Sequence, residues 1–157
     1  MSHYVRRLLI GVLVLLLQWL VLGRLRLWGV YPDAVLIFIV VIALRDGRLS
    51  GSIFGFIFGF FCDMIYGTWG IQMMAKTIVG FLVGLFSIDP RESLNISSGQ
   101  AFLGALVIAL VHHGITVIFF ALTAGTRTPF LIFGLWIGSA IYTAFVAFLA
   151  VLIIPRR

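Results

Sequence analysis

The sequence predicts an all-α integral membrane protein, a compact bundle of about six transmembrane helices forming a single domain over residues 1–157. Composition is the first reason: the chain is 62% hydrophobic and 10% charged, with a mean hydropathy of +1.21. A soluble domain averages about 25% charged residues. The second reason is spacing, because short polar breaks divide the chain into apolar segments. At about 20 residues per helical span, the length leaves no room for a separate soluble domain.

Six apolar segments can be placed between these breaks. The first run follows Arg6 and Arg7 but has no small-x-small cleavage site after it, so we expect a retained helix rather than a signal peptide. The first two segments are short for a span and should extend into their flanks. The segments are residues 8–22, 32–44, 49–66, 71–87, 101–123 and 129–154.

Basic residues at the segment ends predict the orientation. With the N-terminus inside, seven arginines face the cytoplasm and three face outward, which favours an N-in, C-in topology. The net charge of +6 is therefore explained by topology and anionic lipid. No clustered basic patch of the kind used for nucleic acid is present, so we expect no nucleic-acid binding. The inner set is Arg6, Arg7, Arg45, Arg48, Arg91, Arg156 and Arg157, and the outer set is Arg24, Arg26 and Arg127.

Glycines spaced four apart mark close helix contacts. Gly51, Gly55 and Gly59 lie along one side of the third segment, and Gly80 with Gly84 forms a second row in the fourth segment. Residues 134–140 add a third face of small side chains. Glycine weakens a helix in water, but in a membrane it lets another helix approach closely. The rows could serve the chain's own fold or a partner's helix, and the spacing leaves both readings open.

Two charged residues fall inside the apolar segments. Asp63 precedes the turn at residues 67–70 and Lys76 follows it, so a hairpin places both at similar depth near the outer face. Intramembrane charges are costly, and we expect Asp63 and Lys76 to pair, in a structural role rather than in transport. Asp33 follows Pro32 in the first turn of the second segment, where the helix dipole suffices to explain a carboxylate.

The remaining polar inventory predicts neither an enzyme nor a cofactor site. His112 and His113 point about 100° apart on a helix, so each should hydrogen bond a neighbouring helix rather than share a metal. Cys62 is a small apolar filler. The sequence has no phosphate-binding loop, catalytic triad or paired carboxylates. An enzyme that modifies lipids would therefore have few candidate catalytic residues, and we do not expect this function.

The order of these motifs resembles the MreD family of bacterial rod-shape-determining proteins. Residues 31–33, Tyr-Pro-Asp, resemble the family's Pro-Asp opening of its second helix. Residues 51–63 resemble its Gly-Phe-x-x-Gly-Leu-x-x-Asp core, with Phe60 in place of the leucine. Residues 67–84, with Lys76 among their glycines, resemble the stretch that follows. The resemblance covers about residues 32–84, while segments five and six match no motif.

The resemblance implies a non-enzymatic membrane scaffold of the cell-elongation machinery in the bacterial inner membrane. Members of the family associate with MreC, a bitopic protein with a large extracytoplasmic part. Through MreC they are linked to the actin-like MreB and to the glycosyltransferase and transpeptidase that build lateral peptidoglycan. The family is also similar in outline to the six-helix substrate-binding subunits of energy-coupling-factor transporters. Anionic lipids and a second copy of the chain complete the expected partners.

The resemblance leads to an expected docking site for MreC and to one alternative function. The membrane helix of MreC should pack on a small-residue face, first on Gly51, Gly55 and Gly59 and second on Gly80 and Gly84; Gly55→Leu should then weaken co-purification while leaving the monomer folded. The alternative function is a membrane subunit that binds a vitamin-like small molecule. That function needs a polar pocket on the outer side, for which Trp28, Trp69, Gln72 and Asp63 are the candidates.

Overall fold

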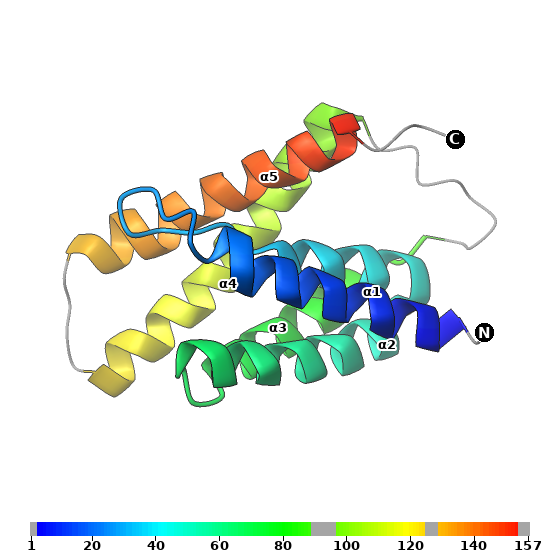
Figure 1. Cartoon of the computed structure of the whole chain (residues 1–157), viewed down its shortest axis with the longest axis horizontal. Coiled ribbons are helices and arrows are strands. Elements are labelled where there is room, and N and C mark those ends of the chain that lie inside the picture. The colour runs from blue at the N-terminus through cyan, green and yellow to red at the C-terminus, as the bar shows by residue number, and fades with distance from the viewer. Residues whose placement is uncertain (1–2, 89–96, 125–128, 154–157) are drawn as a thin grey trace.

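The fold is described from a computed structural model, for residues 3–88, 97–124 and 129–153 (Figure 1). Of the polar stretch expected at residues 89–100, residues 89–96 lie outside this description, and residues 98–100 are helical rather than loop. Residues 125–128 of the break expected at 124–128 also lie outside it, as do Arg91, Arg127, Arg156 and Arg157. The described chain is helical over most of the length of each apolar segment. Its elements are α1 (His3–Leu17), the π-helix η1 (Gln18–Leu22), α2 (Ala34–Tyr66), α3 (Ile71–Gly84), α4 (Ser98–Ala124), the π-helix η2 (Leu131–Gly138) and α5 (Ser139–Ile153).

Helix α2 is divided in two at Gly47. This residue has φ 81° and ψ −178°, a backbone conformation that is essentially restricted to glycine, and the chain reverses direction there (Figure 1). The Ile88 amide donates to the Leu44 carbonyl beside the break, at 2.9 Å. The predicted charged break at residues 45–48 is therefore confirmed, and the second and third segments are the two arms of α2, residues 34–46 and 48–66.

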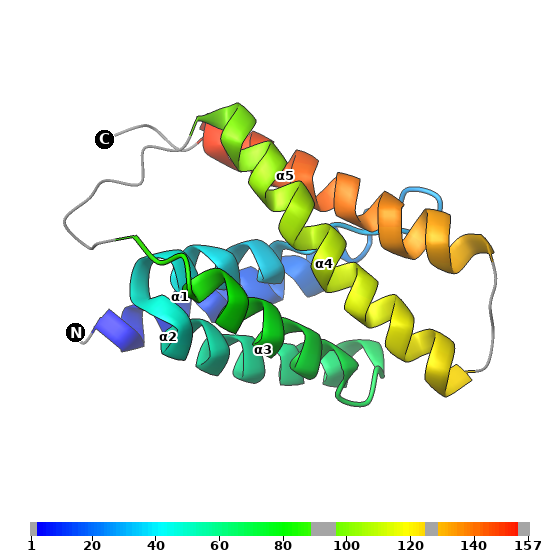
Figure 2. The ribbon, with the colours of Figure 1, turned by 180° about the vertical axis from the view of Figure 1, so that it is seen from behind.

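The helices form two groups. Helix α1, the arms of α2, and α3 lie side by side, while α4 and α5 cross them obliquely (Figures 1 and 2). Two apolar clusters stabilise this arrangement. One is centred on Val35, Ile39 and Phe58 within the first group. The other, which includes Leu36, Val79 and Ala140, joins α2 and α3 to α4 and α5.

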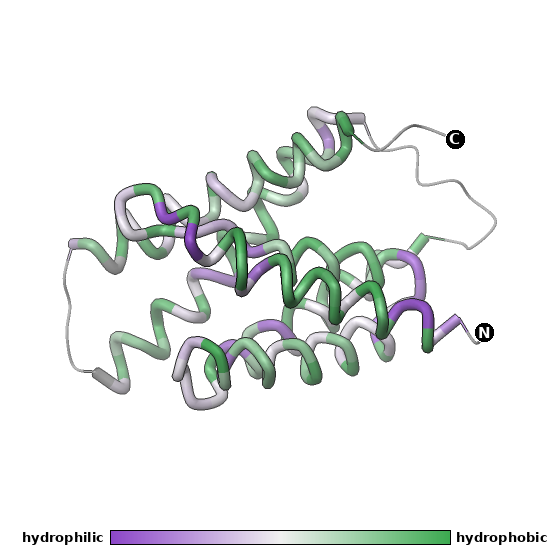
Figure 3. Tube along the Cα trace, in the orientation of Figure 1, coloured by the Kyte–Doolittle hydropathy of each residue, from purple (hydrophilic) through white to green (hydrophobic). Residues whose placement is uncertain are grey.

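Three helical stretches are long and apolar enough to cross a membrane, namely His3–Leu22, Ser98–Thr123 and Ile132–Ile153. Helix α3 is apolar but has only 14 residues. Hydrophobic residues predominate along the helices, and hydrophilic ones lie near the N-terminal end, at turns and at separate positions within the bundle (Figure 3). The described part of the chain is thus all-helical with three span-length helices, and its six-span arrangement stays a prediction.

The glycine rows pack against each other inside the chain. A Cβ atom added at Gly51 would lie 2.4 Å from the Gly80 carbonyl oxygen, and one added at Gly55 would lie 2.5 Å from the Lys76 carbonyl oxygen. Gly59 approaches the Met73 backbone and Gly84 the Arg48 backbone equally closely. The expectation that these faces receive a partner's helix is therefore wrong. Each glycine row packs against the backbone of the other helix. Glycine makes this contact possible because it has no side chain to keep the α2 and α3 backbones apart.

The third small-residue face is also used within the chain. Ser139 and Ala140 are 3% and 0% exposed, and the Gly138 backbone lies beside Val30. The loop before α2 thus packs along the last helix. This contact matters for the site, because it brings Asp33 under α5.

Candidate functional site: a buried polar cluster and its cavity

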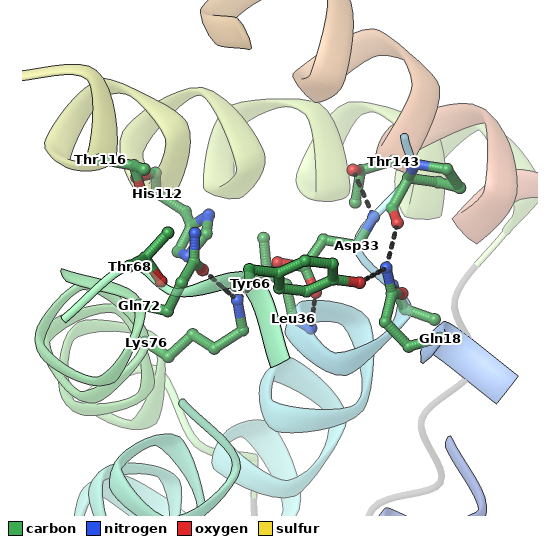
Figure 4. A network of polar contacts seen from close by, with 12 residues as sticks. Gln18, Asp33, Leu36, Tyr66, Thr68, Gln72, Lys76, His112, Thr116 and Thr143 are labelled. Carbon is green, nitrogen blue, oxygen red and sulfur yellow. Dashed lines mark hydrogen bonds and ion pairs between the residues drawn. The ribbon is translucent and has the colours of Figure 1, made fainter. Parts of the chain in front are cut away.

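A lysine lies at the centre of the helix bundle. Lys76 of α3 is 1% exposed, and its Nζ atom donates to Asp33 Oδ2 at 2.5 Å and to Gln72 Oε1 at 2.7 Å (Figure 4). His112 Nε2 of α4 lies 3.4 Å from the same nitrogen. Removing a charge from water costs several kcal/mol, so such a group persists only with good partners. Lys76 has partners from three elements, namely the start of α2, its own helix and α4.

Asp33 joins more elements than a helix cap alone would. Its Oδ1 atom accepts from the Leu36 amide at 2.8 Å, which caps α2, while its Oδ2 atom accepts from Lys76. Its own amide donates to Thr143 Oγ1 of α5 at 3.0 Å. The helix dipole alone does not account for Asp33, because one carboxylate caps α2 and binds α3.

The prediction that Asp63 pairs with Lys76 is wrong. Asp63 Oδ1 accepts from the Gln72 amide at 3.0 Å, and Oδ2 accepts from the Met73 amide at 2.8 Å. The Thr68 hydroxyl also donates to Oδ1. The carboxylate therefore satisfies free amides at the start of α3, where the helix dipole favours negative charge. Being close to the turn in sequence, it reaches these amides and leaves the lysine to Asp33.

Gln18 belongs to the site, although the sequence patterns did not predict it. It lies in η1 and is 2% exposed. Its Nε2 atom donates to the Pro32 carbonyl at 2.9 Å and to the Tyr66 hydroxyl at 3.2 Å, and its Oε1 atom accepts from the Ala34 amide at 2.9 Å (Figure 4). Gln18 thereby ties α1 to the start of α2. The available signal was a single amide inside the apolar run 8–22.

A polar cavity of about 200 Å³ lies beside the cluster. Tyr31 and Tyr66 stack at its wall with ring centroids 5.1 Å apart, and the Arg26 guanidinium lies 5.7 Å from the Tyr31 ring centroid. Burial raises the pKa of the Tyr31 phenol, which keeps it a neutral hydroxyl. The cavity is large enough to hold several water molecules. Its other lining residues are Gln18, Asp33, Cys62, Thr68, Gln72, Lys76, His113, Thr116, Val117, Phe120, Leu135 and Ser139.

The two histidines take different positions. The His112 ring faces Lys76, whereas His113 lines the cavity, with the two ring planes at 78°. His112 Nδ1 and His113 Nε2 are buried without a hydrogen-bond partner among the described residues. A hydrogen bond to a neighbouring helix was expected for each; His112 has such a contact with α3, and His113 Nε2 has none within the described chain. No group of three His, Cys, Asp or Glu side chains gathers within the described ranges 3–88, 97–124 and 129–153.

Of the four candidates for a ligand pocket, only Gln72 lines the cavity. Trp28 and Trp69 are each 96% exposed, and Asp63 is engaged at the start of α3. The arrangement holds a fixed charge pair, neutral donors and acceptors, and a small space between α2, α3, α4 and η2. Comparison with family models, curated proteins and solved structures gave no match to this chain, so the site rests on its own geometry.

Proposed function

We propose that the chain is a non-enzymatic scaffold subunit of the bacterial cell-elongation machinery, which binds MreC and helps to organise lateral peptidoglycan synthesis. In this proposal it resides in the inner membrane with six spans and both termini in the cytoplasm. MreB and the elongation glycosyltransferase and transpeptidase are reached indirectly, through MreC. A homodimer and bound anionic lipids are compatible with the same role.

One observation carries the proposal: the residues on which the family resemblance rests interlock. Asp33 of the Pro-Asp motif binds Lys76, and the Gly51–Asp63 stretch packs along the helix that contains Lys76. Asp63 then caps that same helix. These motifs lie 43 or fewer residues apart in sequence and together hold α2 against α3. The motifs thus form a frame of two helices, and the buried charge of Lys76 is neutralised by Asp33 within the chain. Such an arrangement suits a structural subunit better than a transporter.

The interlocked glycines also limit where MreC can bind. Because α2 and α3 fill each other's glycine rows, the partner's membrane helix must dock on an outer face of the bundle. Opening the α2–α3 contact would break the frame rather than expose a docking groove.

Co-purification tests the proposal. The tagged full-length chain, extracted in mild detergent from the membranes of its own cells, should enrich MreC at least tenfold over an unrelated six-helix protein carrying the same tag, as measured by mass spectrometry. The variant Gly104→Ala should co-purify with MreC as the wild type does, because a Cβ there meets nothing within 4 Å and the fold should be kept. A folded, monodisperse chain that repeatedly emerges without MreC would contradict the proposal.

The cavity is the observation that favours a second candidate, binding of a small molecule. Its volume of about 200 Å³ is below the roughly 300–1,000 Å³ typical of ligand pockets, which favours bound water over a vitamin. We therefore expect a panel of water-soluble vitamins to leave the thermal midpoint of the purified protein within about 1 °C. Saturable stabilisation by one compound, lost in His113→Phe, would replace the scaffold proposal by this one.

A further inference from the structure

Two surface turns of the chain repeat the same dipeptide and the same backbone. Leu27-Trp28-Gly29-Val30 and Thr68-Trp69-Gly70-Ile71 each place Trp-Gly at the centre of a tight turn. In the first, the Val30 amide donates to the Leu27 carbonyl at 3.0 Å; in the second, the Ile71 amide donates to the Thr68 carbonyl at 3.2 Å. The central φ values are 51° and 86°, and 47° and 92°. Both are type I′ turns, which need positive φ at both central residues.

Tryptophan is an unfavourable residue at these positions. Type I′ turns prefer asparagine, aspartate or glycine, and positive φ in a bulky residue is a genuine outlier. Trp28 and Trp69 are the two positive-φ residues other than glycine in the described part of the chain. Each is 96% exposed, so packing within the described chain does not offset the strain. The two tryptophans are therefore strained and unpacked within the described chain, which makes them candidates for a contact outside it.

Both turns lie at the same end of the bundle, where α2 meets α3 and where α4 ends (Figure 1). The segment leading to Trp28 alternates cations with apolar side chains: Leu25 and Leu27 are 52% and 57% exposed, and Arg24 and Arg26 are exposed beside them. Such a segment presents apolar groups and positive charge to the same environment. The headgroup layer of a membrane offers both complements, acyl boundary for the one and phosphate for the other.

Helix α3 is shorter than the hydrocarbon core of a membrane. Fourteen residues at 1.5 Å each give a helix of about 21 Å, against a hydrocarbon core of about 30 Å. The connections at the two ends of so short a helix cannot both extend beyond the headgroup boundary if the helix lies across the membrane. The backbone of the second turn is suited to that boundary, because Asp63 accepts from the amides of Gly67, Thr68, Gln72 and Met73.

We propose that the two Trp-Gly turns are a paired interfacial anchor, which binds the headgroup layer of the membrane leaflet at this end of the bundle. Trp28 and Trp69 insert at the acyl boundary, and Arg24 binds the phosphate of anionic phospholipids. The anchor fixes the depth and tilt of the α2–α3 unit. It is independent of whether MreC is the partner.

Fluorescence of single-tryptophan variants tests the insertion. Variants that keep only Trp28 or only Trp69, with the other tryptophans replaced by phenylalanine, are reconstituted in vesicles of phosphatidylcholine and phosphatidylglycerol. Lipids brominated near the headgroup end of the acyl chains should quench each by more than half, with little quenching by aqueous acrylamide. Water-like emission with full acrylamide quenching would overturn the anchor and would point to a protein partner instead.

A second measurement separates anchoring from a role in folding. In detergent, Trp28→Asn with Trp69→Asn should raise the thermal midpoint by a few degrees, because asparagine tolerates positive φ. Phosphatidylglycerol added to the micelles should stabilise the wild type, and the double variant and Arg24→Gln should lose at least half of that gain. A lower midpoint in detergent, or an unchanged gain in both variants, would contradict the proposal.

Discussion

Replacing Lys76 by methionine should destabilise the protein by about 3–5 kcal/mol, the range for breaking a buried ion pair from one side. The substitution leaves the Asp33 carboxylate buried without its cation, and Gln72 Oε1 loses its donor. Asp33→Asn should have a similar effect in direction but a smaller one, because asparagine still caps α2. Reversible unfolding in mixed micelles, followed by circular dichroism, measures both changes.

The Arg7–Asp46 pair provides the control for this prediction. Its side chains are 23% and 16% exposed, so it lies nearer to solvent than the Lys76–Asp33 pair. Arg7→Met should therefore cost less than Lys76→Met, because water can reach the Asp46 carboxylate more readily than the Asp33 carboxylate. Equal losses for Arg7→Met and Lys76→Met would show that the central pair has no special burial.

Gly55→Leu should abolish the folded monomer. Its Cβ would lie 2.5 Å from the Lys76 carbonyl oxygen and 3.0 Å from the Thr77 Cα, and these are backbone atoms that cannot rotate away. Overpacking of a core costs about 1–3 kcal/mol when side chains can adjust, and more is expected here. Gel filtration in detergent should show aggregate in place of the monomer, and even Gly55→Ala should unfold more readily than the wild type.

Gly104→Leu is the matched control for Gly55→Leu. It lies in α4, and a Cβ there meets nothing within 4 Å, so leucine should be neutral or stabilising by up to about 1 kcal/mol. If Gly55→Leu instead gives a stable monomer, the α2 and α3 backbones do not touch at this glycine. The face would then be free for a partner helix, as the sequence alone first suggested.

The helix pattern was largely readable from the sequence. Hydropathy located the apolar segments, and the charged break at residues 45–48 coincides with the reversal at Gly47. Spacing also identified the glycine rows as contact faces. It could not say what fills them, because a row of four-residue steps is the same for a neighbour in the chain and for a partner.

The sequence could not predict which carboxylate pairs with Lys76, and the reason is physical. Depth along a hairpin puts Asp63 and Lys76 at one level, but depth says nothing about which carboxylate lies closer in the plane of the membrane. Asp63 is held by the free amides that follow its own turn. Asp33 reaches Lys76 because the loop after η1 folds under α5, where Thr143 holds its amide. The cavity depends on the same long-range packing, and so it could not be predicted either.

Two double-mutant cycles on the free energy of unfolding test directly whether Lys76 pairs with Asp33 rather than with Asp63. One combines Asp33→Asn with Lys76→Met, and the other combines Asp63→Asn with Lys76→Met. Residues in direct contact couple by about 0.5–3 kcal/mol. We expect the Asp33–Lys76 cycle to lie in the upper half of that range and the Asp63–Lys76 cycle to lie well below it. A larger coupling for Asp63 than for Asp33 would contradict the arrangement of the buried cluster, and with it the interlocked frame on which the proposed function rests.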